Sequence, residues 1–179
     1  MSKTAFISYG FMEGPRHGVR MRQALQNRGY SMASSAEEAD VVIAHSGGHL
    51  LLPEVSQLSH VLLIDASFTT GRFALDNVMR HIVYDLIHVL GRGEIRYYTW
   101  KTLWNFVYLL REFQSARHMY TRLKNSSYSP ERFIGKATIV QTDDMSWYDS
   151  RSLPLSATTR VHKDHDDCWR HPDRYLDLL

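Results

Sequence analysis

Apolar runs alternate with stretches of helical spacing along the first third of the chain. The runs AFISY at 5–9, VVIA at 41–44 and VLLI at 61–64 predict β-strands, and YSM at 30–32 predicts a further short one. Continuous apolar runs bounded by turn residues are typical of strands buried on both faces. Helical spacing predicts a helix over 19–26, closed by Gly29, and another over 49–58. Strands alternating with helices predict parallel crossover units.

The alternation of strands and helices is interrupted in the middle of the chain and resumes near its end. Residues 70–132 carry two helical patterns, and the centre of the second, at 103–110, is apolar nearly all round. Such a helix has to be covered on more than one side. Two more strands are predicted at 137–141 and 158–162, before a closing helix over 169–179. The apolar side of that helix consists of Trp169, Tyr175, Leu176 and Leu179.

These elements predict one α/β domain over 1–179. We expect a mostly parallel, doubly wound sheet of about six strands, with helices on both faces and a helical insertion at about 70–132. The length of 179 residues suits a single domain. The composition, with 44% hydrophobic and 22% charged residues, excludes a chain that is mainly disordered.

Charge and cysteine content narrow the classes of partner and compartment. Lys and Arg number 21 against 19 Asp and Glu, and the two signs are interspersed, whereas nucleic-acid binders concentrate basic residues on one face. No apolar stretch approaches the ~20 residues needed to span a bilayer, and the first residues lack the pattern of a signal peptide. Cys168 is the only cysteine, so no intrachain disulfide can form. We expect a cytoplasmic protein with no nucleic-acid partner, no membrane span and no cofactor.

The segment Ala44-His45-Ser46-Gly47-Gly48 stands where a buried strand passes into a helix. It has the small-x-Ser-x-small arrangement of a nucleophile elbow, although Ala44 replaces the usual glycine. Small residues are needed there because bulky side chains would clash between the strand and the helix. Free N–H groups at the start of the helix are available to a developing oxyanion. Ser46 is therefore a candidate nucleophile, although a serine at a tight turn is also a common helix cap.

With this elbow and the order of its elements, the chain resembles the α/β-hydrolase superfamily. It is most similar to the small single-domain serine hydrolases of the retinoblastoma-binding serine hydrolase branch. The resemblance implies a minimal α/β-hydrolase fold whose chain order is nucleophile, acid, histidine. It also implies that the long helical segment at 70–132 is a cap, because that is where the family commonly inserts one.

The resemblance further implies a triad of Ser46, Asp144 and His165. Asp144 follows the strand at 137–141, and His165 follows the last strand. The oxyanion hole would use the N–H of Gly47 and an N–H just after the first strand, with Phe11 favoured over Met12. Two other carboxylates, Asp143 and Asp149, follow the same strand and stay open as the acid. His45, beside the serine, is interpreted as a packing residue under the elbow.

The function that follows is hydrolysis of a small carboxylic ester through an acyl-enzyme. Amidase, peptidase or thioesterase action by the same residues, and a catalytically silent binding protein, are the alternatives. A weaker one is a zinc site on His162, His165, Cys168 and His171, which recur every third residue. That spacing drifts around a helix, and Pro172 interrupts any regular element, so we expect no metal and interpret Cys168 as a small buried hydrophobe.

The apolar helix at 103–110 has to meet the sheet edge, a substrate or a second copy of the chain, as in a homodimer. We expect it to roof an apolar pocket over Ser46, with Trp104 or Tyr108 on the wall. The expected partner is thus a small-molecule acyl substrate.

Overall fold

The computed structural model describes residues 3–10, 13–53, 58–66, 137–142, 158–161, 163 and 165–179, with single residues at 99, 100, 103, 104, 107, 110, 111, 117, 121 and 133. The strands are β1 (Lys3–Ser8), β2 (Tyr30–Met32), β3 (Val41–His45), β4 (His60–Ile64), β5 (Ala137–Thr142) and β6 (Thr158–Val161). The helices are α1 (Val19–Asn27), the 3₁₀ helix η1 (Ser46–Leu51), α5 (Asp167–Arg170) and α6 (Asp173–Leu176).

The strands form one six-stranded sheet in the order β2-β1-β3-β4-β5-β6, and every neighbouring pair is parallel. The chain first moves outward from β1 to β2, then returns to β3 on the other side of β1 and proceeds to β6. The predicted α/β class and parallel sheet are therefore confirmed for the described residues. The fully buried pattern of β3, which has no exposed position, explains its continuous apolar sequence.

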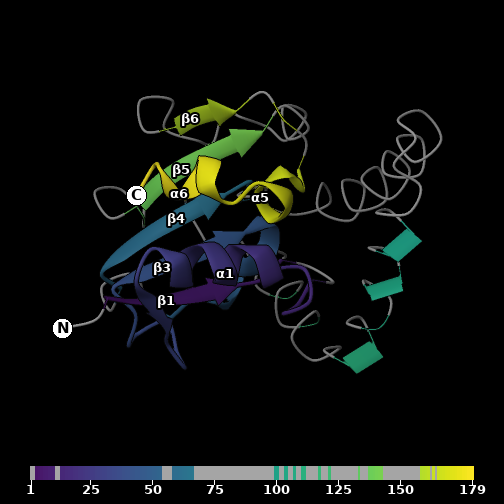
Figure 1. Cartoon of the computed structure of the whole chain (residues 1–179). Helices are drawn as coiled ribbons and strands as arrows, with labels where there is room; N and C mark the ends of the chain where they lie inside the picture. The colour runs from purple at the N-terminus through teal and green to yellow at the C-terminus, as the bar shows by residue number, and fades with distance from the viewer. Residues whose placement is uncertain are drawn as a thin grey trace.

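Successive residues of each strand enter two separate cores, as strand geometry requires. On one face, α1, α5 and α6 lie in front of the sheet (Figure 1) and bury residues such as Met21, Leu25 and Tyr175 against Ile43 and Leu62. On the other face, strand residues pack against a cluster that includes the following side chains: Leu50, Leu52, Leu58 and Phe133. The sheet is thus buried on both sides.

Two predicted helices differ from the structure. The chain after β3 forms the short 3₁₀ helix η1, which ends at Leu51, instead of a helix continuing to 58. The closing helix is divided into α5 and α6 at His171 and Pro172. Proline has no backbone N–H to continue the helical ladder, and His171 leaves the helical region at φ −132°. Leu179, predicted on the buried side, is 39% exposed because it lies beyond the end of α6.

The described residues between 99 and 121 are helical, as predicted, but two of their leucines are open to solvent. Leu103 is 60% and Leu110 is 66% exposed, so the structure shows no cover over these two side chains. Of the predicted insertion at about 70–132, residues 70–98 and 122–132 and most of those between 101 and 120 lie outside the described residues. Within the described part of the chain, no helix has the length and apolar character needed to cross a bilayer.

Gly48 of η1 lies directly against the end of β1. A Cβ at this position would sit 2.3 Å from the carbonyl oxygen of Ser8 and 2.9 Å from that of Tyr9. The Ser8 hydroxyl donates a hydrogen bond of 2.7 Å to the carbonyl of Gly48, which fixes the same contact. The start of η1 is therefore held against β1 by a close approach that only glycine permits.

We expect Gly48→Ala to destabilise the fold by about 3 kcal/mol, because backbone atoms have to shift to admit the methyl group. Gly29→Ala is the control: its φ of +84° is strained for alanine, but nothing lies within 4 Å of the added Cβ, so the cost should be about 1 kcal/mol. Urea denaturation of both variants measures the difference. Equal stabilities of the two variants would contradict the close approach.

Candidate active site

The reversal of strand order between β1 and β3 places two loops side by side at the carboxyl edge of the sheet. Open parallel sheets bind ligands in the crevice at such a switch point, because the connections on either side leave in opposite directions. The loop after β1 begins at Tyr9 and Gly10, and the turn after β3 begins at Ser46. The sequence-predicted nucleophile therefore lies at the position where this architecture places its sites.

Ser46 has a left-handed backbone with φ +51°. Left-handed geometry costs a non-glycine residue about 1 kcal/mol, so it persists only where the surrounding structure enforces it. Here Ser46 joins β3 directly to η1, which makes the turn as sharp as a nucleophile elbow requires. Ser46 and Gly47 are both half-buried, in contrast to the fully buried His45 and Gly48 on either side. The serine is thus partly accessible to solvent at the edge of the sheet.

The loop after β1 approaches Ser46 closely. A Cβ on Gly10 would lie 2.7 Å from the Cβ of Ser46 and 3.0 Å from the carbonyl oxygen of His45. Glycine at this position therefore lets the loop pass beside the candidate nucleophile. Phe11, the predicted second oxyanion donor, and its alternative Met12 follow directly but lie outside the described residues.

His165 pairs with a carboxylate that sequence reasoning missed. Its Nδ1 lies 2.9 Å from Oδ2 of Asp65, the residue after β4. The Asp65 side chain is fully buried, and it also accepts bonds of 2.7 Å from the amide and the hydroxyl of Thr142. Both carboxylate oxygens are thus fixed. An Nδ1–H donated to Asp65 leaves the Nε2 lone pair of a neutral His165 as its basic site.

The register of the sheet explains why Asp65 and Ser46 lie near each other. His45 of β3 is paired with Ile64 of β4, so the next residues, Ser46 and Asp65, leave the sheet at the same level. Asp65 shares the left-handed backbone, with φ +50°. The signal was present in the sequence: Asp65 follows a buried strand, just as the candidate Asp144 does. Asp144 and its alternatives Asp143 and Asp149 lie outside the described residues, so the role of Asp144 stays a prediction.

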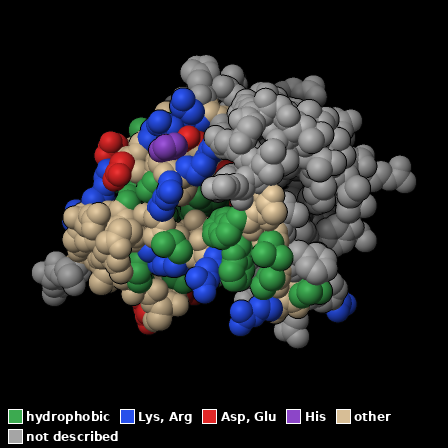
Figure 2. Space-filling view, turned by 45° about the vertical axis from the view of Figure 1, so that its right-hand side comes forward, with side chains coloured by type: hydrophobic (Ala, Val, Ile, Leu, Met, Phe, Trp, Pro, Cys, Tyr) green, Lys and Arg blue, Asp and Glu red, His purple; other side chains and the backbone are tan. Residues whose placement is uncertain are grey.

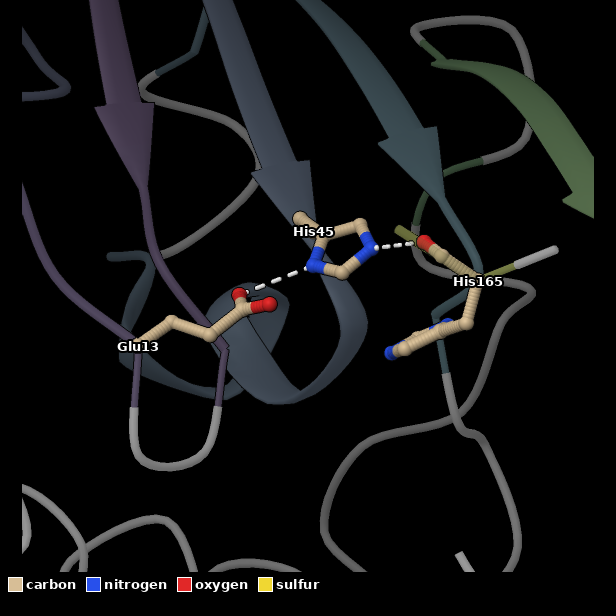
Figure 3. A group of neighbouring side chains, drawn as sticks. All are labelled: Glu13, His45 and His165. Carbon is tan, nitrogen blue, oxygen red and sulfur yellow. Dashed lines mark hydrogen bonds and ion pairs between the residues drawn. The ribbon is translucent and has the colours of Figure 1, made fainter. Parts of the chain in front are cut away.

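Glu13 and His45, the residue before Ser46, form a second acid–histidine pair, and Figure 3 shows it beside His165. Oε2 of Glu13 is 2.8 Å from Nδ1 of His45, and Nε2 of His45 is 2.9 Å from the backbone carbonyl of His165. The other Glu13 oxygen accepts from the indole of Trp169 at 3.0 Å, while Oε2 also accepts from the amide of Gly10 at 2.8 Å. Sequence reasoning interpreted His45 as a packing residue, whereas both of its ring nitrogens bond acceptors, and it missed Glu13.

Both ring nitrogens of His45 face acceptors, which requires a proton on each while Glu13 is ionised. Burial alone would lower the pKa of His45, but the charge and hydrogen bond of the Glu13 carboxylate outweigh burial and raise that pKa well above its ordinary 6.5. Burial raises the pKa of the neighbouring Cys168 thiol to about 11, so at neutral pH the thiol is uncharged and does not compete with Glu13. Burial would raise the pKa of Glu13, yet the charge and hydrogen bond of His45 lower it to about 2. The pair is therefore a buried ion pair.

Glu13, His45 and His165 also have the residue types of a metal site, and their potential ligand atoms lie within 4.8 Å of one another. A metal ligand needs an unprotonated ring nitrogen, whereas His45 directs one nitrogen at a carboxylate and the other at a carbonyl. The donor set therefore fits an ion pair better than a metal ion. Of the zinc candidates, Cys168 is fully buried in the core, His171 is exposed, and His162 lies outside the described residues.

Of the two residues predicted on the wall of a pocket over Ser46, the structure describes only Trp104, and the hollow beside it is not that pocket. Trp104 lines a hollow of about 540 Å³ at the start of α1, together with Trp100 and Trp169. Ser46 is not among the residues that line it. Tyr108, the other predicted wall residue, lies outside the described part of the chain.

The chain matches no protein-family model, no curated protein and no solved structure in comparisons with each.

The buried ion pair predicts a pH-dependent loss of stability in Glu13→Gln. Glu13, with a lowered pKa, stabilises the fold above about pH 4.5, and its contribution to the free energy of unfolding is lost as the pH falls towards 2. His45, with a raised pKa, stabilises it below about pH 6.5, and this is lost as pH rises through the folded-state pKa. Breaking the pair should cost about 3 kcal/mol between these limits and less on either side.

Urea denaturation across this pH range tests the expectation. Glu37→Gln makes the same chemical change at an exposed position and should have almost no effect at any pH. A loss of stability in Glu13→Gln that does not vary with pH would show that the carboxylate acts without an ionic partner.

Proposed function

We propose that this protein is a serine hydrolase that cleaves small carboxylic esters through an acyl-enzyme on Ser46. The observation that carries the proposal is the left-handed Ser46 between β3 and η1, leaving the sheet level with the Asp65 that holds His165. Strained non-glycine backbone concentrates at functional sites. The order Ser46, Asp65, His165 is also the nucleophile, acid, histidine order of the α/β-hydrolase superfamily.

In the proposed reaction, Oγ of Ser46 attacks the ester carbonyl carbon while Nε2 of His165 accepts the hydroxyl proton. The tetrahedral oxyanion accepts hydrogen bonds from the N–H of Gly47 and from a backbone N–H of the loop after β1. His165 then returns the proton to the departing alcohol. Water repeats the sequence on the acyl-enzyme and releases the acid. Asp65 keeps the proton on Nδ1 and offsets the positive charge that forms on the imidazole.

The buried pair Glu13–His45 supports this chemistry by fixing the backbone of the proposed base. His45 donates to the carbonyl of His165, so it fixes the backbone that carries the base. The rings of His45 and His165 lie 4.4 Å apart, centre to centre, and Ser46 follows His45 in the chain. We keep the helical segment at 70–132 in the proposal as a cap, although the hollow that Trp104 lines does not include Ser46.

Ser46→Ala should abolish hydrolysis of p-nitrophenyl acetate and labelling by a fluorophosphonate probe, because no other residue here supplies the nucleophile. Intact-protein mass spectrometry reads the label. Ser34→Ala, at an exposed serine, is the control and should retain both activities. Ser46→Gly should be equally inactive but about 1 kcal/mol more stable than Ser46→Ala, because glycine accepts the left-handed backbone. A wild-type protein that takes up no label would favour the silent binding protein instead.

The identity of the acid is tested by Asp65→Asn and Asp144→Asn, compared in kcat. We expect Asp65→Asn to lower kcat by about 10⁴, as in other triads where asparagine imposes the wrong tautomer on the histidine. Thr142→Val is the matched control, since it removes one hydrogen bond to Asp65 and leaves the carboxylate in place. A far larger loss in Asp144→Asn than in Asp65→Asn would assign the acid to Asp144 and leave Asp65 an anchor for the loop.

A further inference from the structure

The hollow of about 540 Å³ opens at the first turn of α1, beside the loop that follows β1. Its volume lies within the range of small-molecule sites, roughly 300–1,000 Å³. Three arginines and three tryptophans line most of it: Arg16, Arg20, Arg170, Trp100, Trp104 and Trp169. Figure 2 shows hydrophobic side chains gathered on one face of the molecule with Lys and Arg side chains around them.

The charged part of the lining has one sign. Arg16, Arg20 and Arg170 bring three guanidinium groups to the hollow, and no carboxylate is among the described residues that line it. Arg20 donates from Nη1 to the backbone carbonyl of Arg170 at 3.2 Å, which holds α1 and α5 together on this side. Guanidinium groups keep their charge at every physiological pH and bind carboxylates and phosphates through paired N–H donors. The charged side chains among the described lining residues are therefore all basic.

The apolar part of the lining is aromatic. The guanidinium carbon of Arg16 lies 5.1 Å from the centre of the Trp104 ring, close enough for a cation–π interaction. The ring of Trp100 meets His17 edge-on at 5.7 Å. Trp169 is 3% exposed and stacks on Tyr9 at 5.6 Å, so this wall is fixed by the core. Indole faces favour flat ring systems, which stack on them or meet them edge to face.

We propose that this hollow binds an organic anion that carries a planar aromatic ring. The ring packs against the indoles of Trp100 and Trp104, with Trp169 as a fixed wall, and the carboxylate or phosphate group pairs with the guanidinium of Arg16. Arginines alone would bind any anion, and tryptophans alone would bind any flat apolar molecule. The two kinds of side chain together therefore select a ligand that has both features. The inference goes beyond the hydrolase proposal, because it would stand if Ser46 proved inert.

Isothermal titration calorimetry of the unmodified chain with three probes tests the inference. Naphthylacetate, the carboxylate of naphthylacetic acid, has both the anion and the aromatic rings. Naphthylethanol has the rings without the charge, and cyclohexylacetate, the carboxylate of cyclohexylacetic acid, has the charge without the aromatic rings. Naphthylacetate should bind at least about tenfold tighter than either of the others, as expected for one charged hydrogen-bonded pair or one aromatic contact. None of the probes is an ester, so the result does not depend on the serine chemistry.

Two variants locate the binding. Arg16→Gln, at an exposed side chain, should weaken naphthylacetate about tenfold and leave naphthylethanol unchanged. Trp104→Leu should weaken both aromatic probes. Arg117→Gln removes the same charge at an exposed position outside the hollow and should alter neither. Equal binding of naphthylacetate and naphthylethanol, equal effects of Arg16→Gln and Arg117→Gln, or no saturable binding of naphthylacetate at millimolar concentration would each overturn the proposal.

Discussion

The ion pair between Glu13 and His45 is the contact on which the carboxyl edge of the sheet depends. The Glu13 carboxylate accepts hydrogen bonds from Gly10 in the loop after β1, from His45 at the end of β3 and from Trp169 on α5. His45 extends the same network to the carbonyl of His165. Segments far apart in the chain are therefore positioned by one carboxylate. Such a network stabilises a buried site only when every polar group is satisfied, and here each oxygen of Glu13 and each ring nitrogen of His45 has a partner.

The register of the sheet positions Ser46 and Asp65 relative to each other. Pairing of His45 with Ile64 ends β3 and β4 at the same level, and both chains continue into a residue with left-handed backbone. Ser46 and Asp65 can hold this geometry because the strands behind them are fixed from both sides: β3 pairs with β1 and β4, and β4 pairs with β5. The amide of Asp65 also donates to the carbonyl of Val140 at 2.9 Å. The strain is thus maintained by hydrogen bonds that would break if the backbone relaxed.

Sequence reasoning succeeded where a single local property decides the outcome. Strands such as β3 and β4 were predicted because a strand buried on both faces has to be apolar throughout. Ser46 was singled out because a sharp strand-to-helix turn requires small neighbours. The pairing of His165 could not be predicted, because it depends on which of several loops at the sheet edge comes closest to it, and neither Asp65 nor Asp144 differs in its local pattern. Glu13 was missed for the same reason: it lies in the loop after β1, and its partner is 32 residues away at the end of β3.

Trp169 contacts both the Glu13–His45 network and the hollow at the start of α1. Its N–H donates to Glu13, its ring meets the ring of His45 edge-on at 4.9 Å, and it also lines the hollow at the start of α1. The ion pair of Glu13 and His45 carries no net charge, so it adds no charge to that of the arginines on the other side of the Trp169 indole. An anion held in the hollow is therefore attracted by the arginines and not by the buried cation of the pair. One indole separates a binding surface from the network that positions His165, and a change in its orientation would act on both.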